Sequence, residues 1–181
     1  MNKPNLYLVV LGGRFPKANI ELHDVRWVIG NDIKDTIPSL KQQWFGPRKG
    51  LHIDSFVKVS SVDQHWVILY KKKNKKLISN YNKLWFVNLG GYKKEELAEQ
   101  HQFGLVVAPT MIDAKNKAKR KWLRSHYNVH KDDIDEIVGV DAIDNCLPLD
   151  DFKGWNIELL YDKNIADNKL IPDWNGYWRI D

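Results

Sequence analysis

The chain contains one strand-like pattern twice, and this repeat constrains the fold more than any other feature. Residues 6–13 read LYLVVLGG and residues 84–91 read LWFVNLGG. When the sequence is shifted by 78 positions, the two stretches align, and the match continues without a gap to Val140-Asp141, with Trp and His residues recurring in register. A gapless match of this length indicates an internal duplication, so we expect both halves to fold on one template.

The second copy is longer than the first by an insertion. After Asp141, the stretch DAIDNCLPLDDFK (141–153) contains about a dozen residues without a counterpart in the first copy, and the copies align again where VILY (67–70) meets ELLY (158–161). Insertions are tolerated best in loops. We therefore expect residues 141–153 to form a loop that contains Cys146.

Each copy reads as two strands, a helix and two further strands. The apolar runs before the paired glycines predict buried strands that end in a glycine turn. Helical spacing of apolar residues predicts one helix in each copy, over residues 32–45 and 110–125. The other strands are expected at residues 25–30, 55–62, 65–72, 105–109, 135–142 and 155–163. The sequence thus predicts an α+β fold of two tandem β-β-α-β-β modules, with mainly antiparallel sheet, a helix on one face of each module and a pseudo-two-fold relation between them.

The two expected helices begin differently. Pro38 interrupts the first, which either starts near Thr36 with Pro38 in its first turn or is kinked. The second has Thr110 and Asp113 at the spacing of a capping box. Its apolar stripe consists of Met111, Ala114, Ala118 and Trp122, and its opposite side carries Lys117, Arg120 and Arg124.

The repeat also predicts domain boundaries. We expect a first module at residues 1–75, a linker at 76–83, a second module at 84–163 and a C-terminal tail at 164–181. The tail contains Trp174 and Trp178, and we expect it to pack on the body because Trp buries a large apolar area. Asn175-Gly176 between them predicts a tight hairpin turn.

Composition narrows the class of protein. The formal charge of +5 is mildly basic, which permits an acidic partner without requiring one. A single cysteine, Cys146, excludes an intrachain disulfide and a thiolate metal cluster. The apolar run at residues 6–11 is short and recurs at 84, so it reads as a strand and not as a signal peptide. No stretch approaches the roughly 20 apolar residues of a membrane helix. We expect a cytoplasmic protein that does not associate with membranes.

Several of these motifs carry a resemblance to a known family. The stretches LYLVVLGG, NIELHDVRWVIG, WFG and LHIDSF, and the second LWFVNLGG with VVAP and its alanine-bearing helix, resemble a bacterial family catalogued as domain of unknown function 1543. The resemblance covers about residues 6–162 and implies the two-copy form of that family. It implies no activity, substrate or catalytic residue. The second copy departs from the pattern where Gln102 replaces Asp24 and WLR (122–124) replaces WFG (44–46).

The main candidate site follows the paired glycines. Backbone N–H groups at a glycine turn can bind an anion, and a nearby Glu-x-His pair can supply acid–base chemistry. The alternative is structural: the glycines form a turn that needs positive φ, and Glu and His orient each other. The candidate ligand-binding residues are Gly12, Gly13, Arg14, Glu21 and His23 in the first copy and Gly90, Gly91, Glu99 and His101 in the second. Glu21 and His23 are also the candidate catalytic pair.

Two further kinds of site are weighed beside it. His52 and Asp54, which align with His130 and Asp132, form a candidate metal site if they meet His23, although the sequence lacks an established metal-binding spacing. Lys117, Arg120 and Arg124 form a candidate nucleic-acid surface, although a charged helix face is usually only solvated.

The sequence alone therefore predicts a two-module binding or interaction protein, with a small anionic ligand as its expected partner. The alternatives are an enzyme that uses Glu21 and His23, with or without a metal, and a nucleic-acid-binding protein. It predicts no particular cofactor and no oligomeric state.

Overall fold

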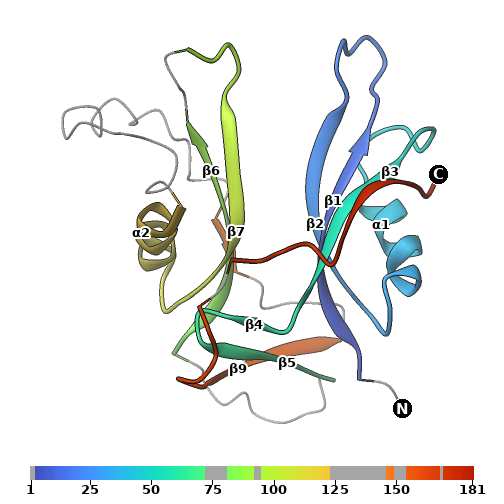
Figure 1. Ribbon diagram of the computed structural model, residues 1–181. Helices are drawn as coiled ribbons and strands as arrows, with labels where there is room; N and C mark the ends of the chain where they lie inside the picture. The colour runs from blue at the N-terminus through green and yellow to red at the C-terminus, as the bar shows by residue number, and fades with distance from the viewer. Residues whose placement is uncertain (1–2, 72–80, 92–94, 123–145, 149–153, 168) are drawn as a thin grey trace. The chain divides into compact units, whose positions relative to one another are not determined.

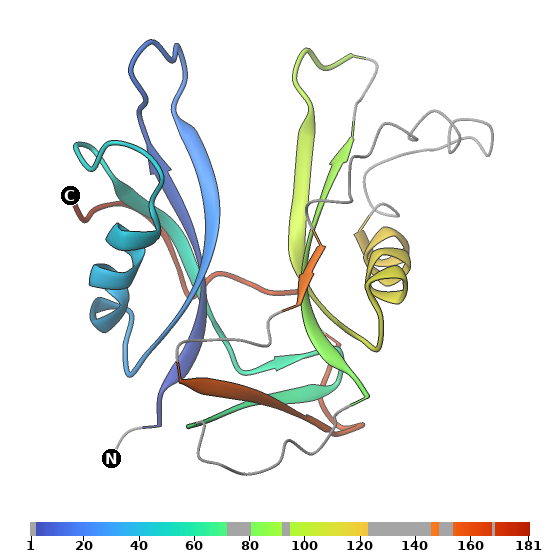
Figure 2. The ribbon, with the colours of Figure 1, turned by 180° about the vertical axis from the view of Figure 1, so that it is seen from behind.

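The structure, a computed structural model, describes residues 3–71, 81–91, 95–122, 146–148, 154–167 and 169–181. Within these residues it consists mostly of antiparallel sheet with two short α-helices, so the fold is α+β, and a strand pair followed by a helix occurs twice (Figures 1 and 2). The strand expected at 135–142 and most of the linker expected at 76–83 lie outside the described residues.

The chain divides into two compact units. The first comprises residues 1–61, 67–69 and 168–181, and the second comprises residues 62–66 and 70–167. Each unit therefore includes a segment from outside its own repeat. The first unit takes in the C-terminal residues, and the second takes in a short piece of the first copy.

A four-stranded antiparallel sheet forms the first unit, in the order β10-β3-β1-β2. Its strands are β1 (Asn5–Gly13), β2 (Leu22–Gly30), β3 (His52–Val59) and β10 (Trp174–Arg179). The Leu, Val and Tyr residues of β1 are almost all buried, which suits a strand that is flanked on both sides. In this register, Gly12 lies opposite both His23 on β2 and His52 on β3.

A short helix follows β2. The 3₁₀ turn η1 (Lys34–Thr36) leads into α1 (Ile37–Gln43), which lies beside the sheet (Figure 1). Pro38 is in the first turn of α1, where a missing N–H is tolerated, so the first of the two alternatives for this helix is the observed one. Leu40 is fully buried against the sheet, and burial of such a side chain contributes about 1.5–3 kcal/mol.

The second unit contains a three-stranded sheet in the order β7-β6-β8. Its strands are β6 (Lys83–Gly91), β7 (Gln100–Ala108) and β8 (Cys146–Pro148). Val87 pairs with Cys146 on β8, as Val9 pairs with Phe56 on β3. The expected loop around Cys146 is therefore wrong in part, because this residue lies in a strand that takes the place of β3. The offset between the copies is 78 from Val9 to Val87 but 90 from Phe56 to Cys146.

Helix α2 (Met111–Trp122) packs beside β6 and β7. The N-cap half of the expected capping box is observed: the Thr110 hydroxyl accepts a hydrogen bond from the Asp113 backbone N–H and donates one to its carboxylate, at 3.2 and 2.6 Å. Ala114 and Ala118 are fully buried, which lets the helix lie close to the sheet. Met111, expected on the same stripe, is 39% exposed.

A third sheet has the order β4-β5-β9, from β4 (Ser61–Val62), β5 (His65–Lys71) and β9 (Trp155–Tyr161). The two residues between β4 and β5, Asp63 and Gln64, have φ of 50° and 62°. Two consecutive left-handed residues are typical of a two-residue type I′ hairpin turn.

The Asn-Gly pair of the tail does not form the hairpin that we expected. Asn175 and Gly176 lie inside β10, whose register with β3 shifts between Asn175 and Trp178. The prediction is wrong because glycine relieves backbone crowding in a bulge as well as in a turn, and Gly176 has a φ of 152°. The bulge places Tyr177 beside β3.

Candidate functional site

The paired glycines make room for side chains and do not form a turn. Gly12 and Gly13 lie in β1, and neither is among the described residues with positive φ. A Cβ atom on Gly12 would overlap the Nε2 atom of the His52 imidazole, and one on Gly13 would come within 2.7 Å of the Trp44 indole. The expected glycine turn with positive φ is therefore wrong, while anion binding near these residues stays a prediction. Glycine is required here because other side chains occupy the space above the strand.

Four polar side chains meet over Gly12, and we call them the Gly12 cluster: Glu21, His23, His52 and Asp54. The Nε2 atom of His23 lies 3.4 Å from Glu21 Oε1 and 3.3 Å from Asp54 Oδ2. The Nε2 atom of His52 lies 3.1 Å from Asp54 Oδ1 and 3.8 Å from Glu21 Oε1. The sequence named all four residues as candidates but could not show that they meet.

Local strand geometry directs these side chains to one place. His23 on β2 and His52 on β3 are both register partners of Gly12, so a central residue without a side chain separates them. Ile53 pairs with Leu11 and Ser55 with Val10, which leaves Asp54 as an extra residue at a β-bulge. Bulges change the direction of a side chain and are frequent beside functional sites.

His52 is the buried member of the cluster. Its side chain is 1% exposed, whereas those of Glu21, His23 and Asp54 are 38%, 51% and 28% exposed. Its Nδ1 atom lies 2.8 Å from the Gly50 carbonyl oxygen, which can only accept, so Nδ1 carries the hydrogen. In the neutral ring, Nε2 then presents a lone pair to the cluster. This atom has no hydrogen-bond partner among the residues that the structure describes, although a carboxylate oxygen lies 3.1 Å away.

The C-terminal strand supplies one wall that the sequence did not reveal. The Tyr177 ring lies against the His52 imidazole, with ring centroids 4.1 Å apart and an interplanar angle of 34°. Tyr177 remains 62% exposed, so its ring borders both the buried imidazole and the surface. Nothing in the repeat pattern pointed to it, because it lies outside both copies.

Half of this arrangement recurs in the second unit. Gly90 pairs with His101 as Gly12 pairs with His23, and a Cβ on Gly90 would overlap the Glu99 carboxylate. His101 Nε2 lies 3.7 Å from Glu99 Oε2, and His101 Nδ1 lies 3.4 Å from the Asn88 side-chain amide nitrogen. His130 and Asp132 lie outside the described residues.

The remaining candidates are placed elsewhere. Arg14 is exposed just after β1. Gly91 ends β6, and residues 92–94, which follow it, are outside the described part of the chain.

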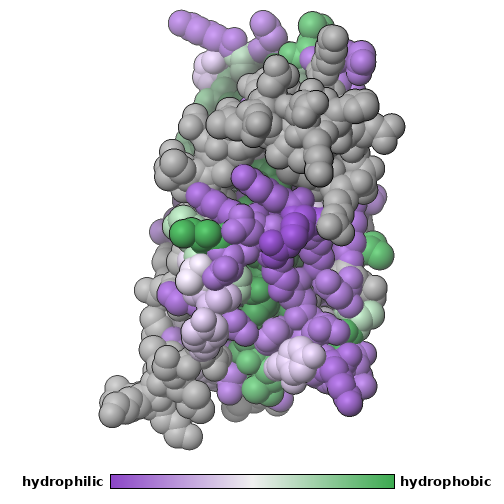
Figure 3. All heavy atoms as spheres, turned by 90° about the vertical axis from the view of Figure 1, so that its left-hand side faces the viewer, coloured by the Kyte–Doolittle hydropathy of each residue, from purple (hydrophilic) through white to green (hydrophobic). Residues whose placement is uncertain are grey.

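The candidate nucleic-acid residues on α2 do not form one solvated face. Lys117 donates to the Val107 carbonyl oxygen at 2.9 Å and pairs with Asp63 at 2.7 Å, so it lies on the sheet side of the helix. The placement expected from helical spacing was wrong for this residue because Lys117 directly precedes the buried Ala118, so its long stem extends from the flank of α2 to Asp63. Arg120 is exposed, and Arg124 lies outside the described residues. Among the coloured atoms of Figure 3, hydrophilic side chains predominate, with smaller apolar patches between them.

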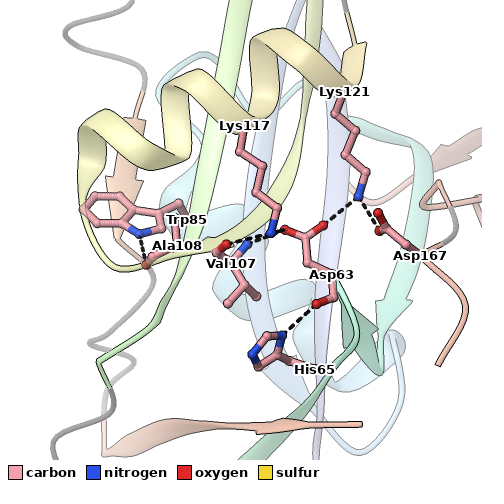
Figure 4. A network of polar contacts seen from close by, with 8 residues as sticks. All are labelled: Asp63, His65, Trp85, Val107, Ala108, Lys117, Lys121 and Asp167. Carbon is pink, nitrogen blue, oxygen red and sulfur yellow. Dashed lines mark hydrogen bonds and ion pairs between the residues drawn. The ribbon is translucent and has the colours of Figure 1, made fainter. Parts of the chain in front are cut away.

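A buried carboxylate organises this part of the second unit (Figure 4). Asp63, with a side chain that is 2% exposed, accepts hydrogen bonds from the Val107 backbone N–H at 2.7 Å and from Lys121 at 2.6 Å, and it pairs with Lys117. Burial by itself raises the pKa of Asp63, but the donors from Lys117, Lys121 and Val107 outweigh it, and the pKa is lowered. The sequence carried one signal of this role, since Asp63 aligns with Asp141 in the repeat.

The described residues include neither a ready metal site nor a helix that could span a membrane. As the side chains stand, no group of three or more His, Cys, Asp or Glu residues in this part of the chain is arranged to hold a metal ion. No helix among the same residues has the length and apolar character needed to cross a membrane.

Comparison with known proteins places the chain in a family. The model of a domain of unknown function, DUF1543, matches residues 18–69 and again residues 96–147. All four residues of the Gly12 cluster lie in the first matched range, and β10 lies outside both ranges.

A solved structure is similar over nearly the whole chain. The crystal structure of a protein Il1583 from Idiomarina loihiensis has 31% sequence identity and a TM-score of 0.71, and the match covers 98% of each chain. A search of curated proteins found no match. The two family matches together span more than half of the sequence, and the chain belongs to the DUF1543 family in its two-copy form.

Proposed function

We propose that the first unit binds a small positively charged ligand at the Gly12 cluster. One observation carries the proposal: the buried Nε2 atom of His52 lies beside the Asp54 carboxylate without a hydrogen bond. Both atoms bear lone pairs when the ring is neutral, and two such atoms 3.1 Å apart repel each other. A positive charge between them turns the repulsion into attraction, whether a proton, a metal ion or an organic cation supplies it.

The charge of the cluster favours a cation over the anion that the sequence suggested. Glu21 and Asp54 contribute two carboxylates, and His23 and His52 contribute acceptor nitrogens when neutral. A unit charge about 4 Å from a carboxylate gains roughly 4 kcal/mol near a protein surface, where the effective dielectric constant is about 20. An anion in the same place would meet a repulsion of the same size from each carboxylate.

Two kinds of cation share this chemistry. A divalent metal of the zinc type is bound by His nitrogen and carboxylate oxygen at about 2.1 Å, and it would require the cluster to rearrange, because no three donors now enclose a metal position. Glu21 and His23 are partly exposed and can change rotamer. An ammonium or guanidinium group would instead donate hydrogen bonds to the carboxylates and to His52 Nε2.

The test is calorimetric titration of the untagged protein with ZnCl₂ or MnCl₂ alone, and separately with butylammonium and guanidinium. We expect one of these cations to bind with one-to-one stoichiometry and Asp54→Asn to weaken it at least about tenfold, or about 1.4 kcal/mol. Glu99→Gln, at the corresponding position of the second unit, is the matched control for Glu21→Gln and should leave the affinity unchanged. Absence of binding by all four probes would refute the proposal.

Several more detailed expectations that follow from the internal duplication remain proposals. They are the β-β-α-β-β order of both modules, their pseudo-two-fold relation and the expected boundaries at 75, 83 and 163. Cytoplasmic location and bacterial origin also remain predictions. The repeated strand pair and helix support the common template.

A further inference from the structure

We infer that the C-terminal strand β10 completes the Gly12 cluster, with Asp181 as a positioning residue for His52 and Tyr177 as a contact residue for the bound cation. This inference rests on the proposed function for its ligand, but its geometric part stands independently. The ligand-binding side chains come from β2, from Glu21 just before it and from β3. The residues that hold and cover His52 come from a segment more than 100 positions later in the chain.

The positioning argument follows a chain of hydrogen bonds. The Gly50 backbone N–H donates to Asp181 Oδ2 at 2.9 Å, and the Gly50 carbonyl oxygen accepts from His52 Nδ1 at 2.8 Å. Asp181 thus holds Gly50 through its N–H, and the carbonyl on the other side of the same residue selects the tautomer of His52. Gly50 has a φ of 83°, a left-handed conformation that only glycine adopts readily, so this turn depends on outside contacts to hold it.

Asp181 is itself fixed by its neighbours. The Arg179 guanidinium donates to both carboxylate oxygens, at 3.1 and 2.6 Å. This bidentate pair and the Gly50 N–H lower the pKa of Asp181 to about 2, so the carboxylate stays ionised across the neutral range. The Ile180 N–H donates to the Leu51 carbonyl oxygen at 3.0 Å, and the buried Ile180 side chain anchors the strand in the core.

Tyr177 has a different role from Asp181. Its ring lies on the His52 imidazole and keeps more than half of its surface exposed, at the bulge where β10 shifts register against β3. An aromatic ring that lies against the His52 member of the cluster offers a bound cation a polarisable wall. The wall requires only the aromatic ring, so cation affinity should depend on the ring and not on the hydroxyl.

The experiment records the side-chain ¹⁵N resonances of His52 and the affinity for whichever probe cation the wild-type protein binds. Asp181→Ala should change the Nδ1 and Nε2 shifts from a single tautomer towards a mixture and lower affinity about tenfold, and Asp181→Asn, which retains an acceptor oxygen for Gly50, should restore both. Tyr177→Ala should weaken binding, whereas Tyr177→Phe should not.

Asp173→Ala is the matched control. Asp173 also accepts a backbone N–H of β3, from Lys58 at 2.5 Å, but at the far end of the strand contact. The Asp173→Ala substitution should leave the His52 resonances unchanged. Equal changes in Asp173→Ala and Asp181→Ala would overturn the inference, because they would show only general docking of the strand. If no probe cation binds to the wild type, the proposed function fails, while the His52 resonances still decide the positioning role of Asp181.

Discussion

Asp63→Asn tests whether a buried carboxylate holds the β4–β5 turn to β7 and α2 within the second unit. Asp63 accepts the Val107 N–H and lies within 2.7 Å of both Lys117 and Lys121. Asparagine keeps the shape, tolerates the left-handed φ of 50° and retains one acceptor oxygen, so the substitution removes the charge without straining the turn.

The expected loss in the free energy of unfolding depends on how exposed Lys117 and Lys121 are. Removing one member of a fully buried pair costs about 3–5 kcal/mol, but the Lys117 and Lys121 side chains are 36% and 24% exposed, so both ammonium groups can regain water. Lys121 also keeps its contact with Asp167. The bond from Val107 persists in a neutral form that is about half as strong. We therefore expect a loss of about 2 kcal/mol in the free energy of unfolding at pH 7.

The pH dependence gives a second readout. The pKa of Asp63 is lower in the folded protein than its ordinary value of 3.8, so its contribution is complete above that value. It is lost as the pH falls through the lowered folded pKa. The difference between wild type and Asp63→Asn should therefore be full at pH 7 and shrink below about pH 3.8.

The assay is urea unfolding followed by tryptophan fluorescence. Asp167→Asn is the matched control, because Asp167 is the exposed end of the same network, and it should cost less than about 1 kcal/mol. A change for Asp63→Asn within about 0.5 kcal/mol of zero at pH 7, which is the range of ordinary surface substitutions, would refute the reasoning.

Three further predictions concern glycine, capping and the core. Gly12→Ala should abolish cation binding and lower the free energy of unfolding by about 1–3 kcal/mol, because the new Cβ meets the buried His52 ring. Gly90→Ala should lower it less, because its Cβ meets only the end of the flexible Glu99 side chain. Thermal unfolding of the two variants compares these effects. Thr110→Ala should lower the free energy of unfolding by about 1 kcal/mol through loss of the α2 cap, measured in urea, and no change would contradict the capping role. Ile53→Ala, at a fully buried position, should cost about 2–5 kcal/mol in the same assay, and a cost below that range would show that the site is not tightly packed.

The sequence predicted more of the fold than of the site. Periodicity located α2 and its cap, because helix signals are local and Thr110 acts within one turn of Asp113. It did not show that the residues around Cys146 pair with β6 as β3 pairs with β1, since a gapless register cannot show that extra residues precede Cys146. It assigned Asn175-Gly176 to a turn for a similar reason: the same dipeptide serves a bulge when a neighbouring strand is present.

For the candidate site, the repeat marked side chains that the structure brings together, and it suggested a ligand of the opposite charge to the one that we propose. Glu21, His23, His52 and Asp54 recur in register, and repetition alone marked them. The glycines suggested a turn, whereas Gly12 lies in a strand and leaves space for His52. That distinction depends on strand pairing, which places His23 and His52, 11 and 40 positions from Gly12 in the sequence, beside it.

The sequence by itself determined the duplication, the family, the α+β class and the set of polar residues over the paired glycines, because these follow from residue types and their spacing along the chain. Only the tertiary structure decided that Gly12 lies between His23 and His52, that a bulge directs Asp54 towards them, and that Tyr177 and Asp181 join them from the C-terminal strand. The physical reason is that side-chain chemistry is local, whereas the electrostatic character of a site depends on which distant strands pair and in which register.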